Sequence, residues 1–395
     1  MALRIGIPIS TFLLGTGLPG IDKYAYNLIL ALERIEGVEI LVFQEKYRDN
    51  GPFDRFDIRY FPILKEFLGI RQHHEPVQAA DDVPPPVKKE ISDFSRLRRG
   101  IVKSLSYLSR GVDVIHYPSH MEDPLRWTFS KTVLTFHDLV PMVRPETSTQ
   151  EIVDRFNRCV ERLGYVDELL TVSEFSRSEM VTKLGVDASR ITVAHNGVDK
   201  IFFLERPDEK IARKYSGGFP YILFVGTLEP RKNVEVLIEA FGELDEPELK
   251  LLLVGKEGWE SERVHSKVRE SGLESAVIFP GYVPEEELPF LYQSAEVFVY
   301  PSLYEGFGMP VLEAMAAGAP VVTSNTSSLP EVAGDAAILV SPDSVSEIAE
   351  AIRGVMGNNQ LRRKLTDRGK KRAGGFTWDR CARRTLEAYC GSPES

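Results

Sequence analysis

The chain has 395 residues, of which 43% are hydrophobic and 27% charged, and its formal net charge is −10 at pH 7. This length favours two domains, each with its own core, and the negative charge argues against general nucleic-acid binding. Three cysteines without metal-ligand spacing predict a reducing compartment and no disulfide framework. No apolar run approaches the roughly 20 residues that span a bilayer, so we expect a cytoplasmic protein.

The first expected unit is a strand over residues 3–9, a loop over 10–20 and a helix over 21–34. The loop reads Gly15-Thr16-Gly17-Leu18-Pro19-Gly20, which matches the G-x-G-x-x-G pattern of dinucleotide-binding turns. Two features weaken a nicotinamide or flavin site here. The first glycine does not directly follow the strand, and Pro19 stiffens a turn that would have to wrap around a phosphate. We therefore disfavour that interpretation.

Strands over 38–43 and 57–61 continue this sheet, and residues 71–93 then form a polar, proline-rich stretch that predicts a mobile surface segment or lid. Residues 94–110 predict a basic amphipathic helix. Such a helix either lies on an anionic membrane surface or is an ordinary helix that packs on the core with a solvated cationic face. We favour the second interpretation over peripheral membrane contact at the inner face.

Further strands end in polar residues, and the carboxyl ends of parallel strands share one edge of a sheet. The strand over 132–136 leads to His137, which is either a satisfied turn residue or a donor to a bound sugar. The strand over 169–172 leads to Ser173, which suits the cap of the next helix. The strand over 191–194 leads to His195-Asn196-Gly197-Val198-Asp199.

A second set of elements opens with a strand over 221–225, followed by Gly226 and Thr227 and then by Arg231 and Lys232 at the start of a helix. Two adjacent cations lie there at the unfavourable end of the helix dipole. An anion such as a diphosphate would remove that penalty, with Arg231 binding in bidentate fashion and Lys232 as a point charge. The alternative is a pair of solvated loop charges.

The stretch 297–331 is the most informative part of the sequence for both fold and function. It predicts a buried strand over 297–300, a loop over 301–307, a helix with Pro310 at its start and Gly318 at its end, and a strand over 319–324. Glu305 lies in the loop, and Glu313 is expected in the first helical turn. The amides of residues 307–309 lie between them, where unpaired N–H groups attract an anion. Taken alone, Glu305 is as well explained as a solvated loop residue.

Glu305-x7-Glu313, within PSLYEGFGMPVLEAMAAGAPVV, resembles the signature of retaining glycosyltransferases of family 4, which have the GT-B fold. The resemblance extends from about residue 5 to residue 385. It implies an α/β protein with two Rossmann-like domains that face each other across a cleft. Residues 1–200 would form the acceptor-side domain, with the C-terminal helix 376–390 packing on it, and residues 201–375 would form the donor-side domain.

The resemblance also implies roles for individual residues. His137 would face the transferred sugar, and Glu305 would bind its hydroxyl groups. This chain has Thr227 where some relatives carry arginine, and we expect Arg231 to compensate. The implied catalytic residues are His137, Arg231, Lys232 and Glu305, and the implied donor contacts are Gly17, Gly20, Gly226, Thr227, Tyr282, Val283, Phe307, Gly308, Met309, Glu313 and Glu331.

These residues predict a retaining glycosyltransferase that moves a hexose from a nucleotide-diphosphate sugar to a saccharide or lipid-linked acceptor. The sequence holds no Asp-x-Asp, the acidic metal-chelating motif of the other main glycosyltransferase fold, so we expect no metal ion and no cofactor. The EPRKN segment resembles members that use GDP-mannose. The alternatives are an epimerase or phosphorylase of the same fold and a non-catalytic protein that binds nucleotide sugars.

Overall fold

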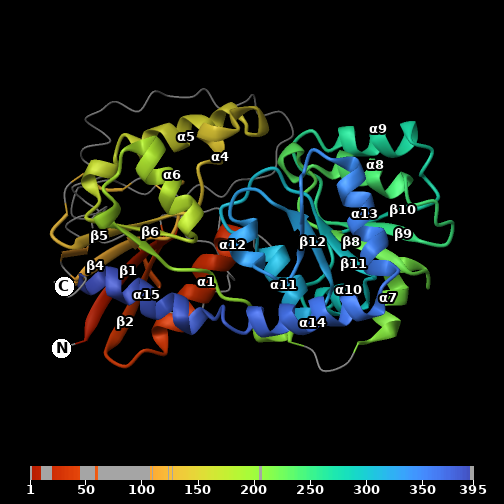
Figure 1. Cartoon of the computed structure of the whole chain (residues 1–395). Helices are drawn as coiled ribbons and strands as arrows, with labels where there is room; N and C mark the ends of the chain where they lie inside the picture. Colours follow the sequence, from red (N-terminus) through yellow and green to blue (C-terminus); the bar gives the residue numbers. More distant parts are fainter. Residues whose placement is uncertain are drawn as a thin grey trace, which may run out of the picture. The chain divides into compact units, whose positions relative to one another are not determined.

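The structure is a computed structural model of the whole chain (Figure 1). It describes residues 2–9, 20–44, 58–60, 107–108, 110–122, 124–126, 128–203 and 207–391. Gly17, the predicted lid over 71–93 and most of the predicted basic helix over 94–110 lie outside these ranges.

The first sheet has seven strands in the order β3-β2-β1-β4-β5-β6-β7. Its described strand pairs are parallel. The strands are β1 (Leu3–Ile9), β2 (Val38–Gln44), β3 (Ile58–Tyr60), β4 (Val114–Tyr117), β5 (Lys131–Phe136), β6 (Glu168–Thr171) and β7 (Ile191–Val193), and the associated helices are α1 (Gly20–Glu33), α4 (Val140–Val143), α5 (Gln150–Val160) and α6 (Glu174–Leu184).

The second sheet has six strands in the order β10-β9-β8-β11-β12-β13, also parallel. The strands are β8 (Tyr221–Val225), β9 (Lys250–Val254), β10 (Val277–Gly281), β11 (Val297–Tyr300), β12 (Val321–Ser324) and β13 (Ile338–Val340). The helices are α7 (Glu209–Ser216), α8 (Val234–Gly242), α9 (Glu262–Glu270), α10 (Leu288–Ser294), α11 (Met309–Ala317), α12 (Leu329–Ala333), α13 (Val345–Met356), α14 (Asn359–Ala373) and α15 (Trp378–Cys390).

The chain divides into two compact units, one made of residues 1–135 and 158–168 and the other of residues 136–157 and 169–395. The second unit contains Glu305 and all the side chains that contact its carboxylate. The two compact units do not coincide with the two sheets. The predicted division of the chain at residue 200 therefore stays a prediction.

The central strands of the second sheet, β11 and β12, form its buried core. All four residues of β11 and all four residues of β12 are buried, as expected for parallel strands covered by helices on both faces. The helix α11 between them begins after Gly308 and ends at Gly318, and both glycines have left-handed backbone conformations. The predicted strand over 297–300 and the predicted helix stop at Gly318 are thus confirmed, and the helix begins one residue before the predicted Pro310.

The C-terminal helix α15 returns to the first sheet and packs on β7, and Figure 1 shows it following α14 as the last blue helix. The indole N–H of Trp378 donates to Asp199, and a Cβ on Gly197 would lie 2.1 Å from the backbone nitrogen of Trp378. The chain therefore crosses between the sheets beside the start of α15, and only glycine fits at the crossing. Cys159 and Cys381 are buried and Cys390 is exposed, and none of the three forms a disulfide bond.

Candidate active site

Glu305 is the centre of the site. It follows β11 in the loop that leads to α11, and only 8% of its surface is exposed. Four side chains converge on its Oε1 atom. They are Lys232 at 2.6 Å, Ser302 at 2.7 Å, Arg231 at 2.8 Å and Tyr300 at 3.0 Å. Such a set of partners fixes a carboxylate in one orientation and keeps it charged.

Arg231 and Lys232 reach Glu305 from the loop after β8, in a short 3-10 helix over Pro230–Lys232. The Arg231 guanidinium lies between Glu305 and Glu229, at 2.8 Å and 2.6 Å. The backbone carbonyl of Arg231 accepts hydrogen bonds from the amide of Leu303 and the hydroxyl of Ser302. The loops after two neighbouring strands, β8 and β11, are therefore joined, which brings the two predicted cations to the predicted carboxylate.

Burial and charge act in opposite directions on these groups. Burial alone would raise the pKa of Glu305, but the charges of Arg231 and Lys232 outweigh it and lower that pKa to about 2. Burial and the neighbouring Arg231 lower the pKa of Lys232, against the opposing effect of Glu305. Burial would lower the pKa of Arg231 as well, but the Glu305 and Glu229 carboxylates raise it above its ordinary value. Glu305 is therefore an anion across the physiological range.

The start of α11 lies beside this cluster. Gly308 precedes the helix with φ of 103°, and a Cβ there would lie 2.6 Å from a methyl carbon of Leu329. Phe307 and Gly308 are buried, while Met309 is half-buried. Pro310 has no N–H, and the amides of Val311 and Leu312 donate to the carbonyl oxygen of Gly308. The partial positive charge of the helix start, with the N–H of Met309, suits an anion.

Glu313 lies deeper in α11 than predicted. The helix begins at Met309, so Glu313 is its fifth residue and the first turn holds no acidic residue. It is buried, and its carboxylate accepts a hydrogen bond of 3.2 Å from the hydroxyl of Tyr292. Expecting it in the first turn was wrong because Gly308 serves as the N-cap, so the helix begins at Met309, one residue before the predicted start at Pro310.

His137 follows β5 and is buried. Its carbonyl oxygen would lie 2.2 Å from a Cβ on Gly306, the residue after Glu305. The structure therefore places the backbone of His137 directly against the Glu305 loop. Ser176 connects the same two segments, because its hydroxyl donates to the carbonyl oxygens of His137 and Gly306, at 3.2 Å and 3.4 Å.

Other predicted donor contacts lie along the carboxyl edge of the second sheet. Thr227 is exposed after β8, and Gly226 is half-buried. Tyr282 follows β10 and is 54% exposed, with the Lys256 ammonium 5.3 Å from its ring centre, whereas Val283 is buried. Gly20 begins α1 in the first compact unit.

Glu331 and several partners of Glu305 differ from what the sequence indicates. The Glu331 carboxylate binds the start of α6 and His195, and its predicted contact with the donor stays a prediction. Tyr300 and Ser302, which hold Glu305, were not predicted. Their position at the carboxyl end of β11, where a polar side chain interrupts an apolar run, was the available signal.

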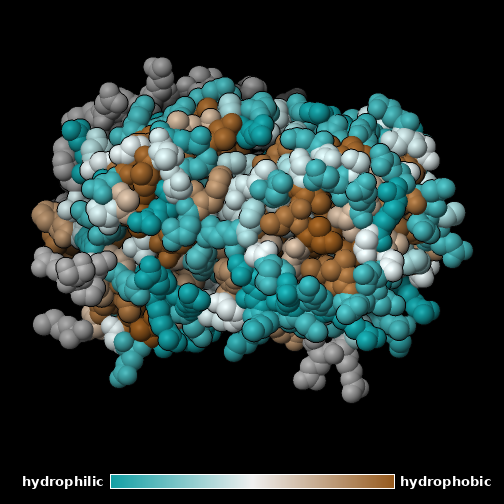
Figure 2. Space-filling view, viewed as in Figure 1, coloured by the Kyte–Doolittle hydropathy of each residue, from teal (hydrophilic) through white to brown (hydrophobic). Residues whose placement is uncertain are grey.

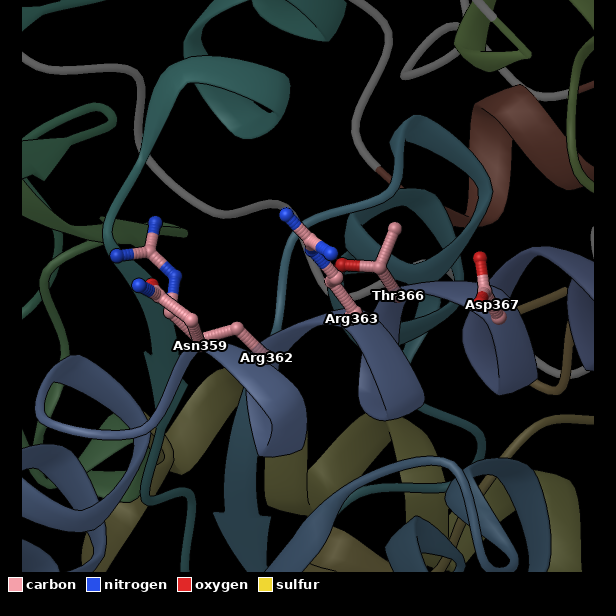
Figure 3. Close-up of a pocket in the computed structure, with 5 residues that line it drawn as sticks. All are labelled: Asn359, Arg362, Arg363, Thr366 and Asp367. Carbon is pink, nitrogen blue, oxygen red and sulfur yellow. The ribbon is translucent and has the colours of Figure 1, made fainter.

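A pocket of about 520 Å³ lies elsewhere in the molecule and is not part of this site. It lies along α14, where Asn359, Arg362, Arg363, Thr366 and Asp367 line it (Figure 3). The Thr366 hydroxyl donates to the carbonyl oxygen of Gly318, at the opposite end of α11 from Gly308. Figure 2 shows mainly hydrophilic side chains over α14.

Within the described residues, no helix combines the length and apolarity needed to cross a bilayer, and no cluster of three potential metal ligands occurs.

Two family models cover most of the chain. Residues 19–200 match the model described as Glycosyltransferase Family 4, and residues 205–372 match the model described as Glycosyl transferases group 1. The boundary between the two matches lies close to residue 200.

Among curated relatives, the O-antigen chain mannosyltransferase B of Escherichia coli is 37% identical over 284 residues, which are 70% of this chain and 74% of that protein. The serotype-specific mannosyltransferase WbdA of E. coli is 30% identical over 66% of this chain. The match spans only 33% of WbdA.

A solved structure shows the same fold at lower sequence identity. Anabaena Alr3699/HepE, in complex with UDP and glucose, superposes with a TM-score of 0.72 at 19% identity, over 98% of this chain and 99% of that one. This superposition over nearly the whole of both chains, together with the two parallel sheets of this chain, confirms the predicted fold class.

Proposed function

Since this chain belongs to the glycosyl transferases of family 4 and group 1, we propose that it transfers mannose from GDP-mannose to a saccharide or lipid-linked saccharide, with retention of configuration and without a metal ion. The observation that carries the choice of sugar is the 37% identity to a protein named as an O-antigen chain mannosyltransferase. WbdA, also named as a mannosyltransferase, supports the same choice.

The charged cluster suits a departing diphosphate. Arg231 and Lys232 supply two fixed cations beside the N–H groups at the start of α11. Cations and amides that are already oriented stabilise the charge that develops on a leaving group without further reorganisation. Because Glu305 and Glu229 neutralise these cations in the cluster, we infer that donor binding redistributes the contacts of Arg231 and Lys232 toward the diphosphate.

We propose the following reaction at this site. The acceptor hydroxyl oxygen forms a bond to the anomeric carbon as the bond from that carbon to the diphosphate oxygen breaks. The hydroxyl proton passes to the departing phosphate on the same face of the sugar, which retains the configuration. Glu305 remains charged and binds the sugar hydroxyls, and it forms no covalent bond in this reaction, because the acceptor oxygen bonds directly to the anomeric carbon.

Glu313 is assigned to the ribose of the donor, and His137 to the transferred sugar. Both side chains are buried at the carboxyl edges of their sheets, in elements adjoining the Glu305 loop. We place the enzyme in the cytoplasm, at the inner face of the membrane when its acceptor is lipid-linked. The relatives' names favour transfer over the epimerase, phosphorylase and non-catalytic alternatives.

The test is a transfer assay with GDP-mannose, UDP-glucose and UDP-galactose, each with and without EDTA, against a panel of mannose-containing acceptors. We expect product only from GDP-mannose, at a rate that EDTA leaves unchanged. Product from a UDP sugar alone would change the donor, and loss of activity in EDTA that magnesium restores would overturn metal independence. Consumption of GDP-mannose without any acceptor product would argue for another activity.

A further inference from the structure

Glu331 occupies an unusual position for a residue of a donor site. It lies in α12, and its carboxylate accepts the backbone N–H groups of Glu174 and Phe175 at 2.9 Å and 3.0 Å. These two residues begin α6. The Nε2 atom of His195 lies 2.6 Å from the Oε1 atom of the same carboxylate. Both oxygens of Glu331 therefore have partners, and the negative charge lies at the positive end of the α6 dipole.

The start of α6 also holds the two segments on which the proposed reaction depends. The hydroxyl of Ser173, the N-cap of α6, donates to the carbonyl oxygen of Gly306 at 2.7 Å. Ser176 donates to the carbonyl oxygens of Gly306 and His137. A single helix start thus fixes the residue after Glu305 and the backbone of His137.

The segment that carries Glu331 holds Glu305 from the other side. The amide of Glu305 donates to the hydroxyl of Ser327 at 3.0 Å, and the hydroxyl of Ser328 donates to the carbonyl oxygen of Glu305 at 2.8 Å. A closed ring of contacts results. It runs from Glu331 to the start of α6, through Gly306 to Glu305, and back through Ser327 and Ser328 to α12.

His195 supports the ring at one further point. Its ring lies 6.2 Å from that of Phe307 and 5.7 Å from that of Phe376. The carboxylate of Glu331 on one side and the two aromatic rings on the other set the orientation of the imidazole. His195 therefore connects Glu331 to the loop that contains Glu305 by a second path.

We propose that Glu331 and His195 are positioning residues, which close this ring and thereby set Glu305 and His137 against the transferred sugar. This inference rests on the proposed function for its effect on catalysis. It replaces the expected contact of Glu331 with the donor, because a donor would compete for oxygens that already have three partners. Misplacement of reacting groups by about 1 Å can cost about 100-fold in rate, even when the altered residue does not touch the substrate.

The first test compares Glu331→Gln with Glu174→Gln. The control removes a carboxylate from the same helix start, but the Glu174 side chain pairs with Arg177 and lies outside the ring. In Glu331→Gln, the added NH2 group faces backbone N–H donors, so the ring opens. We expect kcat for transfer to fall about 10- to 100-fold, while KM for the donor and Kd for the nucleoside diphosphate change less than about threefold. Glu174→Gln should keep the wild-type kcat.

Two outcomes would overturn the proposal. An increase in the Kd of the nucleoside diphosphate equal to the loss in kcat would show that Glu331 binds the donor directly. A kcat within about twofold of wild type would show that the ring does not affect the reaction. His195→Gln, which keeps a hydrogen-bond donor, should retain more activity than His195→Ala, and His195→Ala should add little to the loss in Glu331→Gln.

Hydrogen exchange tests the ring without any substrate. In Glu331→Gln, the amides of residues 174–175 and of residues 305–308 should both exchange faster than in the wild type, at an unchanged melting temperature. Faster exchange at residues 174–175 alone would overturn the coupling. If the wild-type enzyme transfers sugar from no nucleotide donor, the proposed function fails, and the exchange experiment still decides whether the ring exists.

Discussion

Two carboxylates, the buried Glu305 and the half-buried Glu331, are held in different ways. Glu305 is bound by side chains alone, and all four contacts go to one oxygen. Glu331 uses both oxygens, and two of its three partners are backbone N–H groups of α6. Burial would raise the pKa of both groups, but the charges of Arg231 and Lys232 lower that of Glu305, and hydrogen bonds from His195 and the start of α6 lower that of Glu331. Both are therefore ionised at neutral pH.

The difference separates a responsive carboxylate from a structural one. Lysine and arginine side chains have several rotatable bonds and can exchange Glu305 for the oxygens of a diphosphate. Backbone N–H groups at a helix start cannot move without moving the helix. The contacts of Glu305 therefore suit a group that takes part in binding, and those of Glu331 suit a group that keeps a loop in place.

The largest effect is expected for Lys232→Ala. It removes a cation from the proposed diphosphate site, so donor turnover should fall about 100- to 1,000-fold. It also leaves the Glu305 carboxylate with one cation fewer, which should cost about 1–3 kcal/mol of unfolding free energy. Lys214→Ala is the control, since that exposed lysine pairs with Glu287, outside the Glu305 cluster. Turnover within threefold of wild type in Lys232→Ala would contradict the assignment.

Glu313→Ala should have the next largest effect. Loss of a charged acceptor for the ribose should weaken nucleotide binding about 10- to 100-fold, measured by calorimetry. Tyr292→Phe separates this from a packing effect, because it removes only the hydroxyl that donates to Glu313. If both variants weaken binding equally, Glu313 acts through Tyr292 and not on the donor.

Gly306→Ala tests the connection between the two carboxylates. Its Cβ would lie 2.2 Å from the carbonyl oxygen of His137, so one backbone must shift. We expect a loss of about 1–3 kcal/mol in unfolding free energy and about a tenfold drop in transfer. Gly354→Ala, on α13 with open space around it, should be neutral or stabilising. Equal stability of the two variants would mean that the loop relaxes freely.

The smallest expected effect is on the free energy of unfolding in acid, where the charge of Glu305 is lost. The pKa of Glu305 is about 2 in the folded protein, below its ordinary value of roughly 4.3 in an unfolded chain. Its contribution to stability is therefore fully present above the unfolded value and is lost as the pH falls toward 2. Urea unfolding at pH 7, 4 and 3 should show a steeper loss for wild type than for Glu305→Gln. Parallel losses would show that other carboxylates dominate acid unfolding.

The sequence predicted much of the second sheet because local signals there agree with tertiary structure. The predicted strand over 297–300 matches β11, and Gly318 ends α11 as expected. The predicted strand over 319–324 begins two residues earlier than β12. Arg231, Lys232 and Glu305 meet as the parallel topology implies, because they follow neighbouring strands.

The partners of these residues could not be predicted in the same way. Glu331 meets His195 and the start of α6 only because segments more than 130 residues apart come together. No periodicity in one segment encodes such a contact. The N-cap at Gly308 was also missed. It depends on a left-handed backbone conformation and on the closeness of Leu329, which leaves no space for a Cβ at this position.

The placement of the three cysteines has a practical consequence. Burial raises the pKa of the Cys381 thiol to about 12, so that thiol does not readily form the reactive thiolate. Cys159 is buried and therefore out of reach of a bulky reagent. Cys390 is exposed at the end of α15. A maleimide fluorophore should therefore label the wild-type protein at a single site. Its emission would report whether α15 leaves β7 when nucleotides are added, without any engineered cysteine.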